Sequence, residues 1–328
     1  MATLYLDRAQ LELRMDGNVL AMYENGKRRG TVPLGMVERV VVHGRETRFE
    51  SGVLLKLAEA GAAAVFMGAR SSRQVALLLG PRHNDAAVRI AQAQRIGNAD
   101  FCARWSSALV SGKLRRQHAL LLQGEHRRPD ARKALFKAQN TIARIQAQLI
   151  EHPPSLQRLR GMEGAAARAY FQGLTALFPP VLRFHGRNRR PPRDPVNACL
   201  SLGYTLLHFD AVRAAHAAGL DPLIGFYHRP SFGRESLASD LIEPLRPVVD
   251  GWVWSLFRDE ELRESHFSLV DGGCLLGKVG RERFYHLWER FARIQRRWLR
   301  LQCAHLARDL REEGTGWFDP IDDHEGTG

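Results

Sequence analysis

The sequence has few cysteines, no long apolar run and a shortage of acidic residues. Its 328 residues include four cysteines, which lie far apart at Cys102, Cys199, Cys274 and Cys303. This spacing excludes a zinc knuckle or a paired redox motif and predicts buried, reduced thiols. No apolar run approaches the length of a membrane span, and the first residues show no signal pattern. We therefore expect a cytoplasmic protein that has no membrane partner.

The charge balance is strongly basic. The chain has 48 lysines and arginines against 35 acidic residues, which gives a formal net charge of +13. Such an excess favours polyanionic partners, nucleic acid first and anionic membrane second. The sequence also lacks a phosphate-binding loop of the Gly-x₄-Gly-Lys-Ser/Thr type. Any chemistry on phosphates is therefore expected to need no nucleotide as an energy source.

The first part of the chain predicts a small β-rich domain, residues 1–85, within a chain long enough for two domains. Leu11, Leu13 and Met15 alternate with polar residues, and a β-branched run covers Val37 to Val42. One short helix is predicted from Glu50 to Ala60, where Gly61 ends it. These patterns indicate a β domain that carries one helix.

Helical periodicity dominates after Gly80-Pro81 and predicts a larger all-α domain, residues 86–313, followed by a flexible tail, residues 314–328. Helices are expected at 131–150, 155–171, 197–218 and 282–313. The last of these has an apolar face, formed by Phe284, Leu287, Phe291, Ile294, Trp298 and Leu301. Its other face is basic and carries Arg290, Arg293, Arg296, Arg297 and Arg300. The aromatic stripe of Phe284, Trp288, Phe291 and Trp298 is predicted to be core. The fold class is therefore α+β.

Several acids and one histidine form the candidate site. His228 ends the stretch Gly225-Phe226-Tyr227-His228, Asp240 and Glu243 follow within fifteen residues, and Glu163 lies upstream. Carboxylates beside an imidazole are typical ligands of Mn²⁺ or Mg²⁺. Each of these residues alone could instead be solvated or salt-bridged. The apolar neighbours of the last two acids favour burial, and the proline after Glu243 predicts a break in the helix there.

Arginines provide candidate phosphate contacts. The segment 183–193 (RFHGRNRRPPR) predicts an exposed basic loop. Two further arginines lie close to the acids in sequence, where they could steady a substrate phosphate or pair with Asp240. The candidate DNA-binding set is Arg187, Arg189, Arg190, Arg193, Arg234 and Arg246. Each could equally be a solvated surface charge.

An ordered set of motifs resembles a known family. The set comprises GMEGAAARAYF at 161–171, DPVNA at 194–198, GFYH at 225–228, and Gly233-Arg234 followed by LASDLIEPLRP at 237–247. Together they resemble CRISPR-associated protein one, the metal-dependent endonuclease and integrase of spacer acquisition. The resemblance extends over nearly the whole chain, and the ordered set is more specific than any single motif.

The resemblance implies a function and a set of roles. The family inserts short DNA fragments into a CRISPR repeat array by attack of a 3′-hydroxyl on a phosphodiester. The implied catalytic residues are Glu163, His228, Asp240 and Glu243. Glu163, His228 and Glu243 would bind Mn²⁺ or Mg²⁺, and Asp240 would be an additional acid. The implied partners are double-stranded DNA (protospacer and repeat array), a second copy of the chain, and the small ferredoxin-like CRISPR-associated protein two.

Three other functions remain open at this point. The chain could be a non-catalytic nucleic-acid-binding protein whose acids are structural. It could be a metal-dependent hydrolase of small phosphoesters, although its high arginine content argues against this. It could also bind a membrane surface through the basic amphipathic helix at 282–313.

Overall fold

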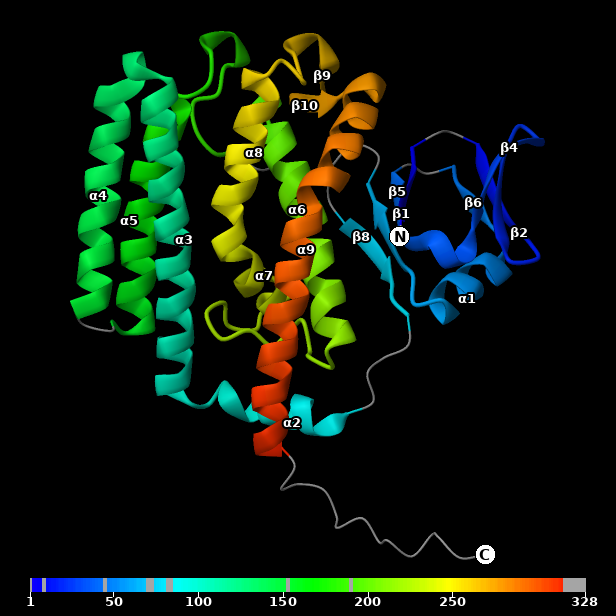
Figure 1. The fold of residues 1–328 in the computed structure, drawn as a ribbon, viewed down its shortest axis with the longest axis horizontal. Coiled ribbons are helices and arrows are strands. Elements are labelled where there is room, and N and C mark those ends of the chain that lie inside the picture. Colours follow the sequence, from blue (N-terminus) through cyan, green and yellow to red (C-terminus); the bar gives the residue numbers. More distant parts are fainter. Residues whose placement is uncertain are drawn as a thin grey trace, which may run out of the picture.

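A computed structural model describes residues 2–7, 10–43, 46–68, 74–80, 85–151, 154–188 and 191–314. It places a strand-rich N-terminal part beside a larger helical part, which confirms the predicted α+β class (Figure 1). The predicted tail begins at Gly314, which the structure places at the buried end of α9 (Lys278–Gly314), and the rest of that tail lies outside the described residues. The helical part also contains an antiparallel hairpin, β9 (Phe267–Val270) and β10 (Gly273–Leu276), which the sequence patterns did not reveal.

The strand-rich part contains two four-stranded sheets. In the first, the order is β1 (Ala2–Leu6), β5 (Val37–His43), β7 (Ala63–Met67) and β8 (Gln74–Leu78); the first three strands are parallel and β8 is antiparallel. In the second, the order is β4 (Lys27–Pro33), β3 (Val19–Glu24), β2 (Leu11–Asp16) and β6 (Arg48–Phe49). Helix α1 (Ser51–Glu59) follows β6, close to the predicted position.

The first sheet is covered on both faces. Alternate residues of β5 point to opposite faces, so Val40 and Val42 belong to a core shared with the second sheet and α1. Val41, between them, belongs to the large core of the helical part. A continuous β-branched run is typical of a strand that is buried on both faces. This strand therefore joins the two cores.

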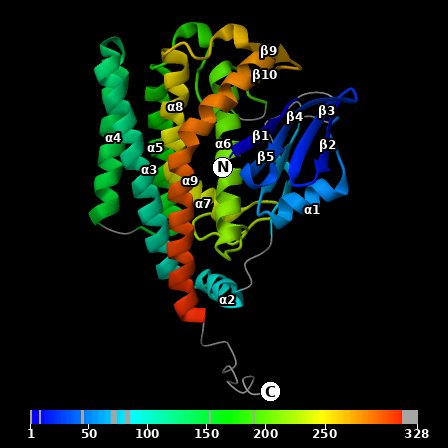
Figure 2. The ribbon, with the colours of Figure 1, turned by 45° about the vertical axis from the view of Figure 1, so that its right-hand side comes forward.

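Eight helices form the helical part among the described residues: α2 (Ala86–Arg95), α3 (Ala99–Arg127), α4 (Arg132–Glu151), α5 (Leu156–Thr175), α6 (Pro195–Ala217), α7 (Ser236–Ile242), α8 (Arg246–Arg258) and α9 (Lys278–Gly314). Asp85, Asn98, Ser155 and Asp194 cap α2, α3, α5 and α6 through side-chain hydrogen bonds. Two views show α6 and α9 between the sheets and the group α3, α4 and α5 (Figures 1 and 2).

Short 3₁₀ turns connect several of these elements: η1 (Leu34–Met36), η2 (Pro129–Ala131), η3 (Pro180–Leu182), η4 (Glu243–Leu245) and η5 (Glu264–His266). None of the helices in the described residues is long and apolar enough to cross a membrane. All four cysteines are buried and unpaired, as predicted.

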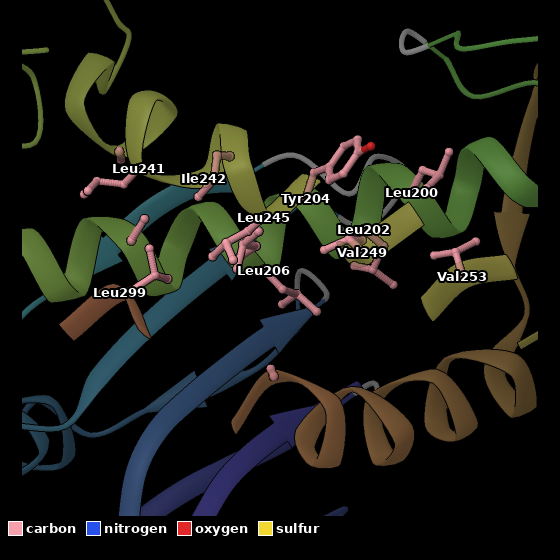
Figure 3. Packing of buried hydrophobic residues seen from close by; sticks show 14 of the residues in the cluster. Leu200, Leu202, Tyr204, Leu206, Leu241, Ile242, Leu245, Val249, Val253 and Leu299 are labelled. Carbon is pink, nitrogen blue, oxygen red and sulfur yellow. The ribbon is translucent and has the colours of Figure 1, made fainter. Parts of the chain in front are cut away.

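Helix α6 lies at the centre of the core. Nearly all of its residues from Pro195 to Ala215 are buried, which its mostly apolar sequence predicts. Leu241, Ile242 and Leu245 lie along this helix, with Leu245 next to Leu206 (Figure 3). This packing fixes α7 and the turn η4 against α6, and so fixes the polar residues that these elements carry.

The predicted apolar face of α9 is only partly correct. Phe284 and Trp288 are fully buried, but Ile294 is 73% exposed and Leu301 is 47% exposed. The predicted face followed a seven-residue repeat, and a straight helix of 3.6 residues per turn drifts away from such a repeat. Most of the aromatic face that membrane binding would use therefore packs into the protein's own core.

The predicted basic face of α9 also needs correction, because Arg296 is buried. Its guanidinium donates to Asp210 Oδ2 of α6 at 2.8 Å and to both carboxylate oxygens of Glu289. Arg39 of β5 approaches the same two acids at 3.8 and 3.7 Å. We call Glu38, Arg39, Asp210, Arg213, Glu289 and Arg296 the interface charge cluster, because it joins the first sheet to α6 and α9.

Candidate metal centre

Two of the predicted acids meet at one buried lysine. Lys113 of α3 donates from Nζ to Glu163 Oε1 of α5 and to Glu243 Oε2 of η4, both at 2.6 Å. Arg246, in the first turn of α8, donates from Nε to the other oxygen of Glu243 at 2.8 Å. The fold therefore brings Glu163 and Glu243 to the two sides of one ammonium group.

The predicted break at Pro244 is confirmed and helps to place Glu243. Helix α7 ends at Ile242, and the 3₁₀ turn η4 begins at Glu243. The leucines and the isoleucine on either side of this glutamate pack into the core, while Glu243 itself is 7% exposed. A buried carboxylate needs partners, and Lys113 and Arg246 supply them.

Asp240 holds the loop that carries His228. Its Oδ2 accepts hydrogen bonds from the backbone N–H groups of Phe226 and Tyr227, at 2.8 and 2.9 Å. Its Oδ1 accepts from the backbone N–H and from Nδ1 of His228, at 2.9 and 2.7 Å. The carboxylate is fully buried and makes four hydrogen bonds. Asp240 is therefore placed to position His228, and its bond to Nδ1 leaves Nε2 with the lone pair that a metal would need.

Gly225 allows this loop to approach α7. A Cβ atom at this position would lie 2.6 Å from the carbonyl carbon of Ser236 and 2.8 Å from the carbonyl oxygen of His228. Both are backbone atoms that cannot move away without shifting the loop. The glycine is thus required for the contact between the histidine loop and the start of α7.

The charges at this site stabilise one another. Burial alone would raise the pKa of Glu243, but Arg246 and Lys113 outweigh burial and lower it to about 2. Burial alone would lower the pKa of Lys113, but Glu243 and Glu163 raise it. The carboxylate of Glu243 and the ammonium of Lys113 are therefore both ionised at neutral pH.

The donor set fits a hard divalent cation. Within the part of the chain that the structure describes, no three histidine, cysteine, aspartate or glutamate side chains form a ready-made metal cluster. The ammonium of Lys113 lies between the two glutamates and supplies positive charge there. Two carboxylates and an imidazole whose other nitrogen is held by a carboxylate match the ligands of Mn²⁺ or Mg²⁺.

The predicted DNA-binding arginines differ in their surroundings. Arg187 donates to Asn197 Oδ1 at 2.7 Å and to Ser201 Oγ at 3.0 Å, so this part of the basic loop packs onto α6 instead of extending into solvent. Arg189 and Arg190 lie outside the described residues. Arg193 is exposed at the start of the following segment.

Two further arginines do not pair with Asp240, contrary to one of the expectations above. Arg246 pairs with Glu243, and its guanidinium lies 4.8 Å from the centre of the Tyr204 ring. Arg234 is exposed and donates to the backbone oxygen of Arg229 at 2.5 Å. The reason is that Asp240 already accepts four hydrogen bonds from the histidine loop.

Two features of the site were missed at the sequence level. Lys113 was not singled out, although it occupies a position between Val110 and Gln117 on the buried stripe of α3. A charged residue on such a stripe is the signal that could have revealed it. Asp250 of α8 was also missed, and it accepts hydrogen bonds from the hydroxyl groups of Tyr170 and Tyr204 in the core behind the site.

Asp250 gives a prediction for the pH dependence of stability. Burial raises the pKa of this carboxyl from 3.8 to about 6, although the two tyrosine hydroxyls partly offset the effect of burial. Between these two pKa values the folded protein retains a proton that the unfolded chain releases. The stability that protonated Asp250 contributes is therefore fully present below about pH 4 and is lost as the pH rises through 6. The free energy of unfolding should lose roughly 3 kcal/mol through this residue between pH 4 and pH 7, and Asp250→Asn should abolish that loss. Urea unfolding between pH 4 and pH 7 measures it.

The control for this prediction is Asp100→Asn, which changes an exposed aspartate in the first turn of α3. Its stability profile should follow that of the wild type. Parallel profiles for wild type and Asp250→Asn would show that Asp250 is ionised in the folded protein throughout this range.

The fold and site together define a class: a basic α+β protein in which two glutamates meet at one buried lysine and an aspartate of α7 holds a histidine on the preceding loop. The sequence profile of the family described as CRISPR associated protein Cas1 matches residues 4–290. "CRISPR-associated endonuclease Cas1 1" of Thermodesulfovibrio yellowstonii is 39% identical over 319 residues, which cover 95% of this chain and 98% of the relative. The chain belongs to the Cas1 family.

Solved structures share this fold at low sequence identity. A casposase bound to integration product matches with a TM-score of 0.82 at 19% identity, over 95% of this chain and 91% of that chain. A chain of a Cas6-RT-Cas1–Cas2 complex matches with a TM-score of 0.81 at 22% identity, over 95% of this chain and 35% of that chain. These matches establish that the α+β arrangement is the one found in such proteins.

Proposed function

We propose that this protein inserts short DNA fragments into a CRISPR repeat array by a metal-dependent exchange of phosphodiesters. It is a Cas1-family endonuclease and integrase of CRISPR adaptation, as its family and its curated relative indicate. The observation that carries the metal-dependent mechanism is the convergence of Glu163 and Glu243 on one cation position in a chain of net charge +13. The acids are buried or partly buried, so they are not ordinary solvated surface charges.

In this mechanism Glu163, Glu243 and Nε2 of His228 would hold Mn²⁺ or Mg²⁺. The cation would polarise the scissile phosphate and lower the pKa of the attacking 3′-hydroxyl, or of water during cleavage. Asp240 orients the imidazole through the hydrogen bond to Nδ1. Arg246 neutralises part of the carboxylate charge of Glu243, so that the site does not repel an incoming phosphodiester.

We also propose the partners that the family implies: duplex DNA, a second copy of the chain and Cas2. Arg193 and Arg234 are exposed and are the better candidates for phosphate contact among the described members of the predicted set. Residues 1–85 would form the domain for dimerisation and partner contact, and residues 86–313 the catalytic domain. The fold shared with a chain of a Cas1–Cas2 assembly supports the partner proposal.

The test is integration of a labelled short duplex into a plasmid that carries a CRISPR repeat, with purified protein alone and with Cas2. Strand transfer is expected with Mn²⁺ or Mg²⁺, and EDTA should lower it at least a hundredfold, because the metal supplies several kcal/mol of transition-state stabilisation. Joined products appear as longer labelled strands on a denaturing gel. Undiminished transfer in EDTA would refute the metal mechanism, and DNA binding without any cleavage or joining would favour the non-catalytic alternative.

A further inference from the structure

Lys113 has an unusual position for a lysine. It is 8% exposed, and its ammonium lies 2.6 Å from a carboxylate oxygen of each of the two proposed metal ligands, Glu163 and Glu243. A lysine is rarely buried unless it is paired, and here both partners are residues of the candidate metal centre. The ion pairs therefore connect the lysine to the site and not only to the core.

The charges show what the lysine does without a metal. Two carboxylates that share a small buried space repel each other unless a cation lies between them. Lys113 and Arg246 provide two positive charges against those of Glu163 and Glu243, so this group of four side chains has no net charge. A divalent cation that takes the place of the ammonium would give the two carboxylates, Arg246 and the metal a net charge of +1, which suits a phosphodiester substrate.

We propose that Lys113 is an internal counter-cation that holds the two glutamates together in the metal-free protein and that metal binding displaces. This inference rests on the proposed function of the site. An ammonium and a divalent cation cannot both occupy the space between the same carboxylate oxygens, so the two compete. Lys113 is thus a positioning residue: it preserves the ligand arrangement before the metal arrives, and it lowers the apparent affinity for the metal.

The surroundings of Lys113 allow its ammonium to move out of the space between the two glutamates. The side chain of Glu163 is 22% exposed, whereas that of Glu243 is 9% exposed, so the site opens toward Glu163. A lysine side chain is a flexible four-carbon stem and can move its ammonium to a new position at low cost. An arginine at the same position would bind the carboxylates through a wider, planar group and would be harder to displace.

The experiment measures Mn²⁺ binding to the metal-free full-length protein by titration calorimetry. Lys113→Met removes the charge and keeps most of the stem, and it should bind Mn²⁺ at least tenfold more tightly than the wild type. It should also unfold at a lower urea concentration without metal and recover more stability than the wild type when Mn²⁺ is added. Lys133→Met, an exposed lysine of α4, is the control and should match the wild type in both measurements.

Lys113→Arg keeps the test decisive if the methionine variant does not fold. It retains a cation between the carboxylates and should bind Mn²⁺ at least tenfold more weakly than the wild type. Equal Mn²⁺ affinity in the wild type and in whichever Lys113 variant folds would overturn the inference and leave the proposed metal centre standing. Absence of Mn²⁺ binding by the wild-type protein would overturn the proposed metal centre itself, and the inference with it.

Discussion

Glu163→Gln is expected to lower DNA strand transfer about a thousandfold or more while the protein remains folded. Glutamine keeps the shape of the side chain and removes the negative charge that would bind the metal. A loss of this size corresponds to about 4 kcal/mol of transition-state stabilisation, which is reasonable for a ligand of a catalytic cation. The measurement is the initial rate of strand transfer in Mn²⁺ with the labelled duplex and repeat-bearing plasmid.

The matched control is Glu282→Gln, which makes the same chemical change at an exposed position of α9. It should retain the wild-type rate. Urea unfolding checks that Glu163→Gln is folded under the assay conditions. A folded Glu163→Gln variant with a near-wild-type rate would remove Glu163 from the metal centre.

Asp210→Asn is expected to destabilise the protein by about 3 kcal/mol. Asp210 is 5% exposed and pairs with Arg296 at 2.8 Å, and it faces Arg39 across the boundary between α6 and the first sheet. Removal of one partner from a buried charge cluster leaves the remaining charges without compensation, which typically costs several kcal/mol. Glu289 still pairs with Arg296 in this variant, so we expect a destabilisation at the lower end of that range.

The free energy of unfolding in urea measures this effect, and Asp309→Asn is the control because Asp309 is an exposed residue of α9. The control should change the free energy by less than about 0.5 kcal/mol. A change equally small for Asp210→Asn would mean that the interface charge cluster contributes little to holding the first sheet against the helices. Strand transfer by the folded fraction of Asp210→Asn should remain, since this residue is not part of the proposed metal centre.

The residue patterns of the sequence predicted much of the architecture correctly. The β-branched run of β5, the short helix α1 and the long helices α4, α5, α6 and α9 were all expected near their observed positions. Local information is sufficient for such elements, because periodicity and caps depend on residues within a few turns of one another. The hairpin β9–β10 was missed because its two strands have only four residues each.

Pairing across long distances was decided by the tertiary structure. Arg296 belonged to a predicted solvent-facing stripe, yet it is buried because Asp210 and Glu289 compensate its charge. Arg187 was expected in an exposed loop, yet it packs onto α6 through Asn197 and Ser201. A sequence pattern reports how often a residue type is buried, and it does not report which opposite charge the fold brings to it.

The motifs alone identified the family, and they singled out the acids and the histidine as candidate ligands, because the ligand types that a hard cation requires are restricted and their order along the chain is specific. They could not reveal that Lys113, fifty residues before Glu163, lies between the two glutamates. Nor could they separate the role of Asp240, which holds His228, from that of Glu243, which faces the ammonium. Those distinctions depend on how α3, α5 and α7 pack together, since only packing sets the distances over which charges attract and hydrogen bonds form.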